Sequence, residues 1–439
     1  MSEKHKVLIL GGGITGLATA YYLEQQGIKD YLILEAQLEP GGLCRSVKKD
    51  GFTWDMTGHV LWRMDPETRV FYDTILGDNL TWVDRKAAVY MHENFVPYPV
   101  QAHLKHLPPQ VAYDCLYGFL TRNHPKSDDF ESWCLSNLGE GLTRHFMRPF
   151  NEKLFGVKLQ DMNADWLADV PVPSVEQILR GAILGETFTM KGNAQFGYPK
   201  VGGMQALVDQ LVQRLDQSKI MTGRRVESID TDKKQVMHLD MAGNQNFVEY
   251  DHLVSTIPFR KFLKVVRPQD GSLNRFGFEL KSNNVACVAL GFEKPLTDLH
   301  WVYTPEPHIP FYRVGFPNNL TESVAPHGCG SVTAEITIPP NVTMSESDFV
   351  KGTLNGLKEM GLWRGEDDNP VMAMKVLYCV PAYVIYDDNQ RKAAGMIKDL
   401  VKSSVYSIGR FGAWHYTSVS DNIIEAREAS KSIAQSIKL

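Results

Sequence analysis

The sequence contains no run of about 18 consecutive apolar residues, so we expect no membrane-spanning helix. Its six cysteines lie far apart and form no CxxC pair, which argues against a metal site or disulfide framework and favours a reducing cytoplasm. The formal net charge of −5 disfavours a nucleic-acid partner. An apolar stretch that predicts a strand starts within the first few residues, so we expect no signal peptide. The remaining class is a soluble enzyme of 439 residues with a small-molecule substrate and two or three structural units.

A glycine-rich turn lies near the start of the chain, between an apolar strand (KVLIL) and a helical pattern. Gly11, Gly13 and Gly16 form GxGxxG, and Glu35 closes the next apolar strand (YLILE). Strand, helix and strand within about 30 residues make a βαβ unit. The glycines permit a tight turn, a close approach of backbone to a pyrophosphate, and close packing of helix on strand. Glu35 can accept hydrogen bonds from a ribose diol, so the pattern predicts a dinucleotide site.

A second glycine pair follows Glu35 in the stretch LEAQLEPGGLCRS. Gly41 and Gly42 predict a backbone turn that can run beside a longer cofactor, and Arg45 can neutralise a diphosphate. At this point the sequence resembles the FAD-dependent family that includes amine oxidases, protoporphyrinogen oxidases and UDP-galactopyranose mutases. The resemblance implies that the cofactor is FAD.

Later segments also resemble this family. RRVESI resembles the strand whose backbone, here at Val226, meets the adenine, and GRFGAWHY followed by DNIIEA resembles the second flavin segment. The cofactor-binding residues that the pattern and the resemblance imply are Gly11, Gly13, Thr15, Gly16, Glu35, Gly42, Leu43, Arg45, Gly58, His59, Val226, Gly409, Arg410, Asp421, Asn422 and Ile423.

The resemblance becomes sharper towards the UDP-galactopyranose mutases. DMTGHV resembles the segment that places a histidine, here His59, beside the flavin ring. PFYRVGF resembles the segment that presents an arginine, here Arg313, to the substrate diphosphate. Tyr383 and Tyr416 lie in segments that resemble those carrying two diphosphate-binding tyrosines. The implied activity interconverts the pyranose and furanose forms of a nucleotide sugar, with N5 of reduced FAD as the nucleophile on the anomeric carbon. NAD(P)H is one candidate reductant.

One expected arginine is missing. The matching position in MKGNAQFGYPK is Ala194 or Gly197, and neither is charged. Lys191 or Lys200 can supply a point charge but not a bidentate fork. This departure keeps open a second interpretation, an FAD-dependent oxidoreductase of the amine oxidase and protoporphyrinogen oxidase type. A third is a flavin-binding protein without turnover.

Several of these residues also have ordinary structural interpretations. Arg313 can belong to an ion pair within a sheet, and the tyrosines at 383 and 416 can be core aromatics with one hydrogen bond each. Trp133 and Trp166 are expected in the core of a helical block rather than against a ligand. The sequence leaves open the sugar, the nucleotide base, the electron donor or acceptor and the oligomeric state.

The predicted fold class is α/β: a discontinuous Rossmann-like FAD-binding domain with an inserted helical block and an antiparallel β-sheet substrate domain. The predicted boundaries are 1–64, 199–265 and 396–439 for the FAD-binding domain, 100–190 for the helical block, and 65–99 with 266–395 for the sheet domain.

Overall fold

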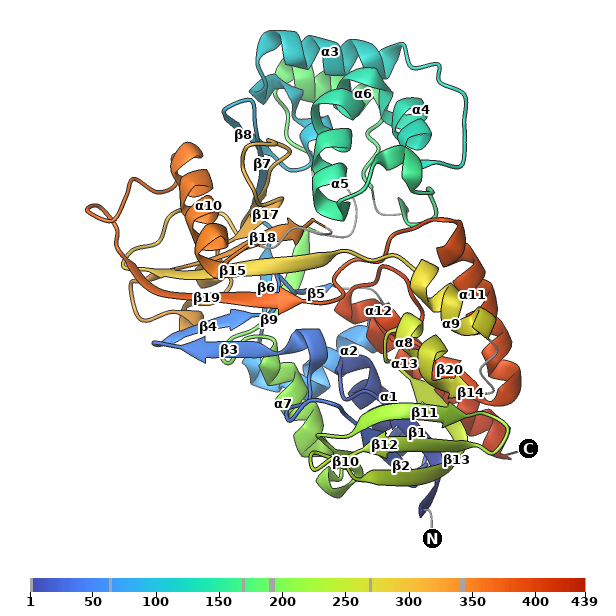
Figure 1. Ribbon diagram of the computed structural model, residues 1–439. Coiled ribbons are helices and arrows are strands. Elements are labelled where there is room, and N and C mark those ends of the chain that lie inside the picture. The colour runs from blue at the N-terminus through green and yellow to red at the C-terminus, as the bar shows by residue number, and fades with distance from the viewer. Residues whose placement is uncertain are drawn as a thin grey trace.

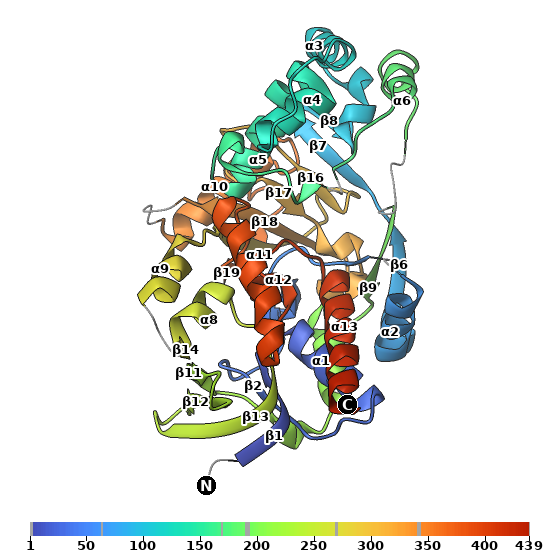
Figure 2. The ribbon, with the colours of Figure 1, turned by 90° about the vertical axis from the view of Figure 1, so that its right-hand side faces the viewer.

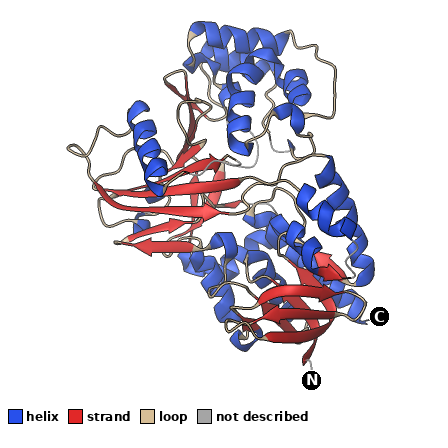
Figure 3. Ribbon diagram, in the orientation of Figure 1, coloured by secondary structure: helices blue, strands red, loops and turns tan. Residues whose placement is uncertain are grey.

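The structure is a computed structural model that describes residues 3–62, 65–167, 170–188, 194–267, 271–339 and 344–438. The chain forms three layers (Figure 1): a helical block at the top, a large sheet in the middle, and a second sheet flanked by helices at the bottom. Figure 3 shows the same division by secondary structure. Within the described residues, no helix is long and apolar enough to cross a membrane. The predicted fold class is confirmed.

The lower layer is an eight-stranded sheet whose strands come from well-separated parts of the chain. Its path is β10-β2-β1-β13-β12-β11-β14, with β20 paired to β13. The strands are β1 (Glu3–Leu10), β2 (Tyr31–Leu34), β10 (Ile220–Met221), β11 (Arg225–Asp230), β12 (Gln235–Leu239), β13 (Gln245–Ser255), β14 (Val266–Arg267) and β20 (Val405–Ser407). β2 is buried at all four residues, as expected for a parallel strand covered on both faces.

Helices cover this sheet on both faces. They are α1 (Ile14–Gln25), α2 (Pro66–Leu76), α7 (Gln205–Arg214), α8 (Phe259–Val265), α9 (Gly271–Glu279), α11 (Asp388–Leu400), α12 (Gly409–Gly412) and α13 (Val419–Lys438). Figure 2 shows α1 and α13, from opposite ends of the sequence, side by side. α1 is apolar on nearly every side because the sheet and α13 enclose it. α2 begins where Asp65 accepts a hydrogen bond from the Thr68 N–H, with proline at the first helical position.

The middle layer is a seven-stranded sheet of order β19-β15-β18-β17-β16-β7-β8, with α10 (Glu346–Glu359) packed against it. Its strands are β7 (Ala87–Met91), β8 (Asn94–Pro97), β15 (Asn284–Phe292), β16 (Trp301–Tyr303), β17 (Arg313–Gly315), β18 (Gly330–Ile338) and β19 (Val371–Cys379). All pairs are antiparallel except β7 with β16, which run parallel. The sheet is therefore mixed at this one pair, because β7 enters from a distant part of the chain.

Two small sheets connect the layers. One pairs β3 (Ser46–Lys49) with β4 (Phe52–Asp55), and the other has the order β5-β9-β6. The strands of the second are β5 (Leu61–Trp62), β6 (Leu80–Asp84) and β9 (Gln195–Pro199). The upper layer consists of α3 (Pro109–Leu120), α4 (Phe130–Leu142), α5 (Arg148–Phe155) and α6 (Val175–Leu179) around its own apolar core.

The carboxyl ends of four parallel strands meet at one edge of the lower sheet. The register pairs Leu10 with Leu34, Leu10 with Ser255, and Ser255 with Ser407. The loops that follow these strands therefore converge at the start of α1. Ligands of open α/β sheets bind at such an edge.

Candidate functional site

The turn between β1 and α1 requires glycine at two positions for its own packing. Gly11 has φ +104°, and an added Cβ would lie 2.3 Å from Oγ1 of Thr256. A Cβ on Gly16 would lie 2.0 Å from the carbonyl oxygen of Gly11. The absence of a Cβ at these two positions therefore allows the turn and the helix to pack this closely.

Gly13 differs, because its backbone does not require glycine. Its φ is −74°, and within the described part of the chain an added Cβ would meet only the Cα of Gly42, at 3.9 Å. Gly13 caps the start of α1, and no side chain among the described residues caps this helix. The first N–H groups of a helix attract an anion, and the missing side chain leaves space for one. The geometry therefore fits the pyrophosphate of a dinucleotide.

Glu35 lies beside this turn. Its carboxylate accepts hydrogen bonds from the N–H of Gly12 (2.6 Å) and the N–H of Gln37 (2.7 Å). The N–H of Arg224 donates to the Glu35 carbonyl, which brings the start of β11, and hence Val226, to the same end of the sheet. The carboxylate is buried and keeps lone pairs for a ribose diol.

The second glycine turn closes over the first. The N–H of Gly41 donates to the carbonyl of Gly12 (2.8 Å), and Gly42 has φ +55°. Nε of Arg45 donates to the carbonyl of Gly42 (3.0 Å), which holds the guanidinium beside the turn. Leu43, between them, lines the large cavity described below.

Polar side chains in the segment from α12 to α13 form hydrogen bonds with other groups of the protein. Oδ1 of Asn422 accepts hydrogen bonds from Thr15 Oγ1 (3.0 Å) and from the N–H of Arg410 (2.8 Å), which ties α1 to α12 and α13. Asp421 accepts from the N–H and hydroxyl of Ser418 and caps α13. The Ile423 side chain is buried in the core. Their side chains shape the site, and among these three Asp421 also lines the cavity.

A cavity of about 750 Å³ lies where the three layers meet. Thr57, Gly58 and His59 line it, and so does Val419 at the start of α13. Burial lowers the pKa of His59 to about 4, with a further contribution from the Arg410 charge, so this imidazole is neutral near pH 7.

Tyr383 and Tyr416 line the cavity and stack on each other, with ring centroids 5.7 Å apart. The Arg410 guanidinium lies over both rings, at 4.9 and 4.8 Å. It also donates to the carbonyls of Ala382 (3.0 Å) and Thr417 (2.7 Å). Both phenols stay protonated near pH 7 and can donate hydrogen bonds to an anion, because a phenol ordinarily titrates near pH 10 and burial raises the pKa of Tyr383 further. Gly409 anchors the loop through its N–H to Glu425 (2.7 Å).

Arg313 reaches the same cavity but is held in an ion pair. Its guanidinium contacts the carboxylate of Glu335 at 2.5 Å, and Glu335 also accepts from Tyr312 Oη (2.6 Å) and the N–H of Gly58 (3.0 Å). Burial would raise the pKa of Glu335, but Arg313 holds it below its usual range. The contacts of Arg313 are therefore those expected of an ion pair within a sheet, because the buried carboxylate of Glu335 already neutralises its charge.

The two positions at which the expected arginine is missing, Gly197 and Ala194, lie in β9 and just before it. An added Cβ on Gly197 would meet Leu80, Leu61 and Trp82, so this position faces apolar neighbours. Ala194 precedes β9 and pairs with Arg85, whose N–H donates to its carbonyl (2.7 Å). Lys191 lies outside the described residues.

Sequence reasoning missed many of the residues that line the cavity, Arg85 and Trp166 among them. Arg85 carries no motif signal, and only the strand pairing brings it to the cavity. Trp166 packs on Phe130 and Phe155 in the helical core, as expected, and it also lines the cavity, with its ring 6.1 Å from the Tyr416 ring. Periodicity places a tryptophan on an apolar face but does not separate a core from a cavity wall.

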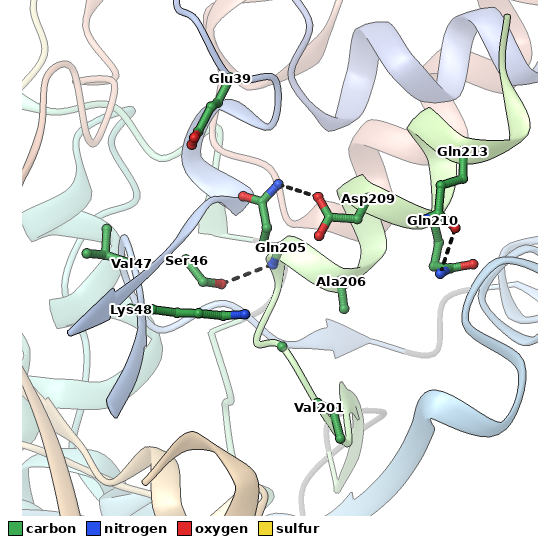
Figure 4. A pocket seen from close by; sticks show the side chains of 11 residues that line it. Glu39, Ser46, Val47, Lys48, Val201, Gln205, Ala206, Asp209, Gln210 and Gln213 are labelled. Carbon is green, nitrogen blue, oxygen red and sulfur yellow. Dashed lines mark hydrogen bonds between the residues drawn. The ribbon is translucent and has the colours of Figure 1, made fainter. Parts of the chain in front are cut away.

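A second hollow of about 500 Å³ lies between β3 and α7 (Figure 4). Its polar side chains bond to one another: Gln205 Nε2 donates to Asp209 (2.8 Å), and the Gln205 N–H donates to Ser46 Oγ (3.0 Å). None of the aromatic residues or arginines that line the large cavity is part of its lining. We therefore place the functional site in the large cavity.

This fold and site define a class of protein. The family model described as flavin containing amine oxidoreductase matches residues 14–383, and the chain belongs to this family. A flavin cofactor follows from that membership, and the uncapped glycine cradle at α1 fits its phosphates.

Comparisons with individual proteins point to different activities. A crystal structure of reduced UDP-galactopyranose mutase superposes with a TM-score of 0.92 and 25% sequence identity, over 99% of this chain and 95% of that one. The 4,4'-diapophytoene desaturase of Staphylococcus aureus is 28% identical over 124 residues, 26% of this chain. The mitochondrial protoporphyrinogen oxidase of Nicotiana tabacum is 31% identical over 74 residues, 17% of this chain. These two matches span only 24% and 14% of the curated proteins.

Proposed function

We propose that the protein is an FAD-dependent mutase that interconverts the pyranose and furanose forms of a nucleoside-diphosphate sugar. The observation that carries this proposal is the likeness to reduced UDP-galactopyranose mutase over 99% of the chain, which includes the helical block and the seven-stranded sheet around the cavity. The curated oxidoreductases match only short stretches. Bound FAD in its reduced form supplies a nucleophilic N5 for the anomeric carbon.

The cavity residues then have separate proposed roles. The phenols of Tyr383 and Tyr416 donate hydrogen bonds to phosphate oxygens, because both remain protonated near pH 7. Neutral His59 lines the same cavity and provides no competing charge there. Arg313 orients the site through Glu335, which fixes the backbone of Gly58. Holding the diphosphate while it is detached from the sugar keeps the return step intramolecular.

The test is an isomerisation assay. FAD-loaded protein is reduced with dithionite, mixed with UDP-galactopyranose, and the sugars are separated by chromatography. We expect a furanose product from the reduced protein and none from the oxidised protein, because the reaction consumes no oxidant but needs the reduced cofactor. Absence of product with a panel of UDP- and dTDP-hexoses contradicts the proposal.

A second candidate is an FAD-dependent oxidoreductase of the amine oxidase and protoporphyrinogen oxidase type. Its specific support is the Arg313–Glu335 ion pair, which leaves less positive charge for a diphosphate than the mutase interpretation expects. This candidate expects an amine or a tetrapyrrole-like substrate to reduce the oxidised flavin, with reoxidation by oxygen or a quinone. Loss of flavin colour on mixing with such a substrate supports it, and unchanged colour counts against it.

A further inference from the structure

Three arginines line the large cavity, and they differ in what they already bind. Arg313 is neutralised by Glu335, and Arg410 donates to two backbone carbonyls. Arg85 has neither kind of contact: among the described residues, its backbone N–H donates to Ala194 and its guanidinium lies over the Tyr98 ring, and no carboxylate or carbonyl accepts a hydrogen bond from the guanidinium. Arg85 is therefore the cavity guanidinium with its donors available to a ligand.

The strand pairing explains how Arg85 reaches the cavity. β6 and β9 are antiparallel, with Asp84 opposite Gln195, and the N–H of Arg85 continues this register to the carbonyl of Ala194. Directly opposite residues of two strands project from the same face of a sheet. Arg85 thus projects next to Ala194, on the face that carries Tyr198 into the cavity.

The surroundings of Arg85 keep its charge available. The guanidinium lies 4.6 Å from the ring centroid of Tyr98, which holds it without neutralising it. A row of aromatic rings in contact with one another lines the cavity, in the order Tyr98, Tyr303, Phe150 and Phe146. An arginine beside an aromatic wall offers a fork for phosphate oxygens and a surface for a planar base.

We propose that Arg85 binds the diphosphate of a nucleoside diphosphate in the large cavity and supplies the cation that Ala194 lacks. This inference rests on the proposed function, because it assigns the anionic part of that substrate. Arg85 acts by charge and bidentate hydrogen bonding, so a neutral side chain of similar length does not replace it.

The experiment measures UDP binding to the FAD-loaded protein by calorimetry. Arg85→Ala and Arg85→Gln should each weaken UDP binding by roughly 10- to 100-fold, and Arg85→Lys by less, because lysine keeps the charge but loses the fork. Arg69→Ala is the matched control. The guanidinium of Arg69, in α2, lies 4.1 Å from the centroid of the Trp82 ring, in β6, and it pairs with Asp73. Arg69 is not among the residues that line the cavity.

Each result decides the question. Weaker UDP binding by both neutral variants, with the Arg69→Ala control unchanged, supports the assignment. Wild-type affinity in Arg85→Gln overturns it and leaves the proposed function standing, since the cavity then binds the diphosphate without this charge. If the wild-type protein binds neither UDP nor dTDP, the proposed function fails and the role of Arg85 fails with it.

Discussion

At the scale of single residues, the contact between Arg313 and Glu335 decides what either side chain can do. Glu335 is 1% exposed, so its carboxylate depends on Arg313, Tyr312 and the Gly58 N–H for every favourable interaction. Removing one member of such a pair leaves an uncompensated buried charge. A loss of ligand binding in an Arg313 variant therefore has two sources, and stability must be measured beside affinity.

Arg313→Ala should lower the free energy of unfolding by about 3–5 kcal/mol, because it leaves Glu335 charged and buried. The double variant Arg313→Leu with Glu335→Leu should lose less than the single variant. Arg225→Ala, which breaks an exposed pair with Glu227, should cost under about 1 kcal/mol. Urea unfolding of the three variants checks this. An Arg313→Ala midpoint equal to that of the wild type means that the ion pair does not stabilise the fold.

His59 should contribute a pH-dependent part of the stability. Its pKa in the folded chain is about 4, below the ordinary value of 6.5, because burial disfavours the charged ring. The unfolded chain therefore binds a proton first as pH falls, so stability is present above about pH 6.5 and is lost towards pH 4. His59→Gln should show a smaller loss over this window in urea unfolding. Equal pH profiles for variant and wild type contradict the assignment.

At the scale of elements, α1 depends on its contact with the turn before it. Gly16→Ala places a Cβ 2.0 Å from the Gly11 carbonyl, so helix and turn must separate, at a cost of about 1–3 kcal/mol. Gly395→Ala is the matched control within α11. Gly395 is exposed and an added Cβ meets nothing described within 4 Å, so alanine should stabilise by about 0.5–1 kcal/mol.

Thermal unfolding of both glycine variants measures these two effects. A loss of stability in Gly16→Ala together with a gain in Gly395→Ala supports the view that close backbone contact, and not helix propensity, decides the residue at position 16, in α1. If Gly16→Ala is as stable as Gly395→Ala, the close approach of α1 to the turn is not required for folding.

The sequence predicts helices, strands and turns well where the motif that indicates them lies within a short stretch of chain. GxGxxG and Glu35 lie within one βαβ unit, so spacing alone predicts the strand, the helix and the turn between them. The pairing of Arg313 with Glu335 depends on the register of β17 with β18, across 22 residues. Arg85 reaches the cavity only through the pairing of β6 with β9, more than 100 residues later in the chain. Such registers depend on tertiary packing, which no short motif records.

At the scale of the whole molecule, different layers form the two ends of the site. The lower sheet forms the nucleotide end from four strand ends that converge on α1. The helical block and the seven-stranded sheet form the large cavity above it. We therefore expect the lower layer to bind the cofactor and the upper layers to select the substrate.

We propose that the open amino end of α1 holds the pyrophosphate of FAD, and a substitution at Gly13 probes this contact. Its backbone accepts alanine, and an added Cβ would enter the space at the helix end without meeting a described protein atom closer than 3.9 Å. The measurement is a titration of cofactor-free wild-type and Gly13→Ala protein with FAD, followed by flavin absorbance. We predict that the wild type binds FAD and that Gly13→Ala, with an unchanged unfolding midpoint, binds at least about tenfold more weakly. Failure of the wild type to take up FAD, or equal binding by both proteins, would contradict the account.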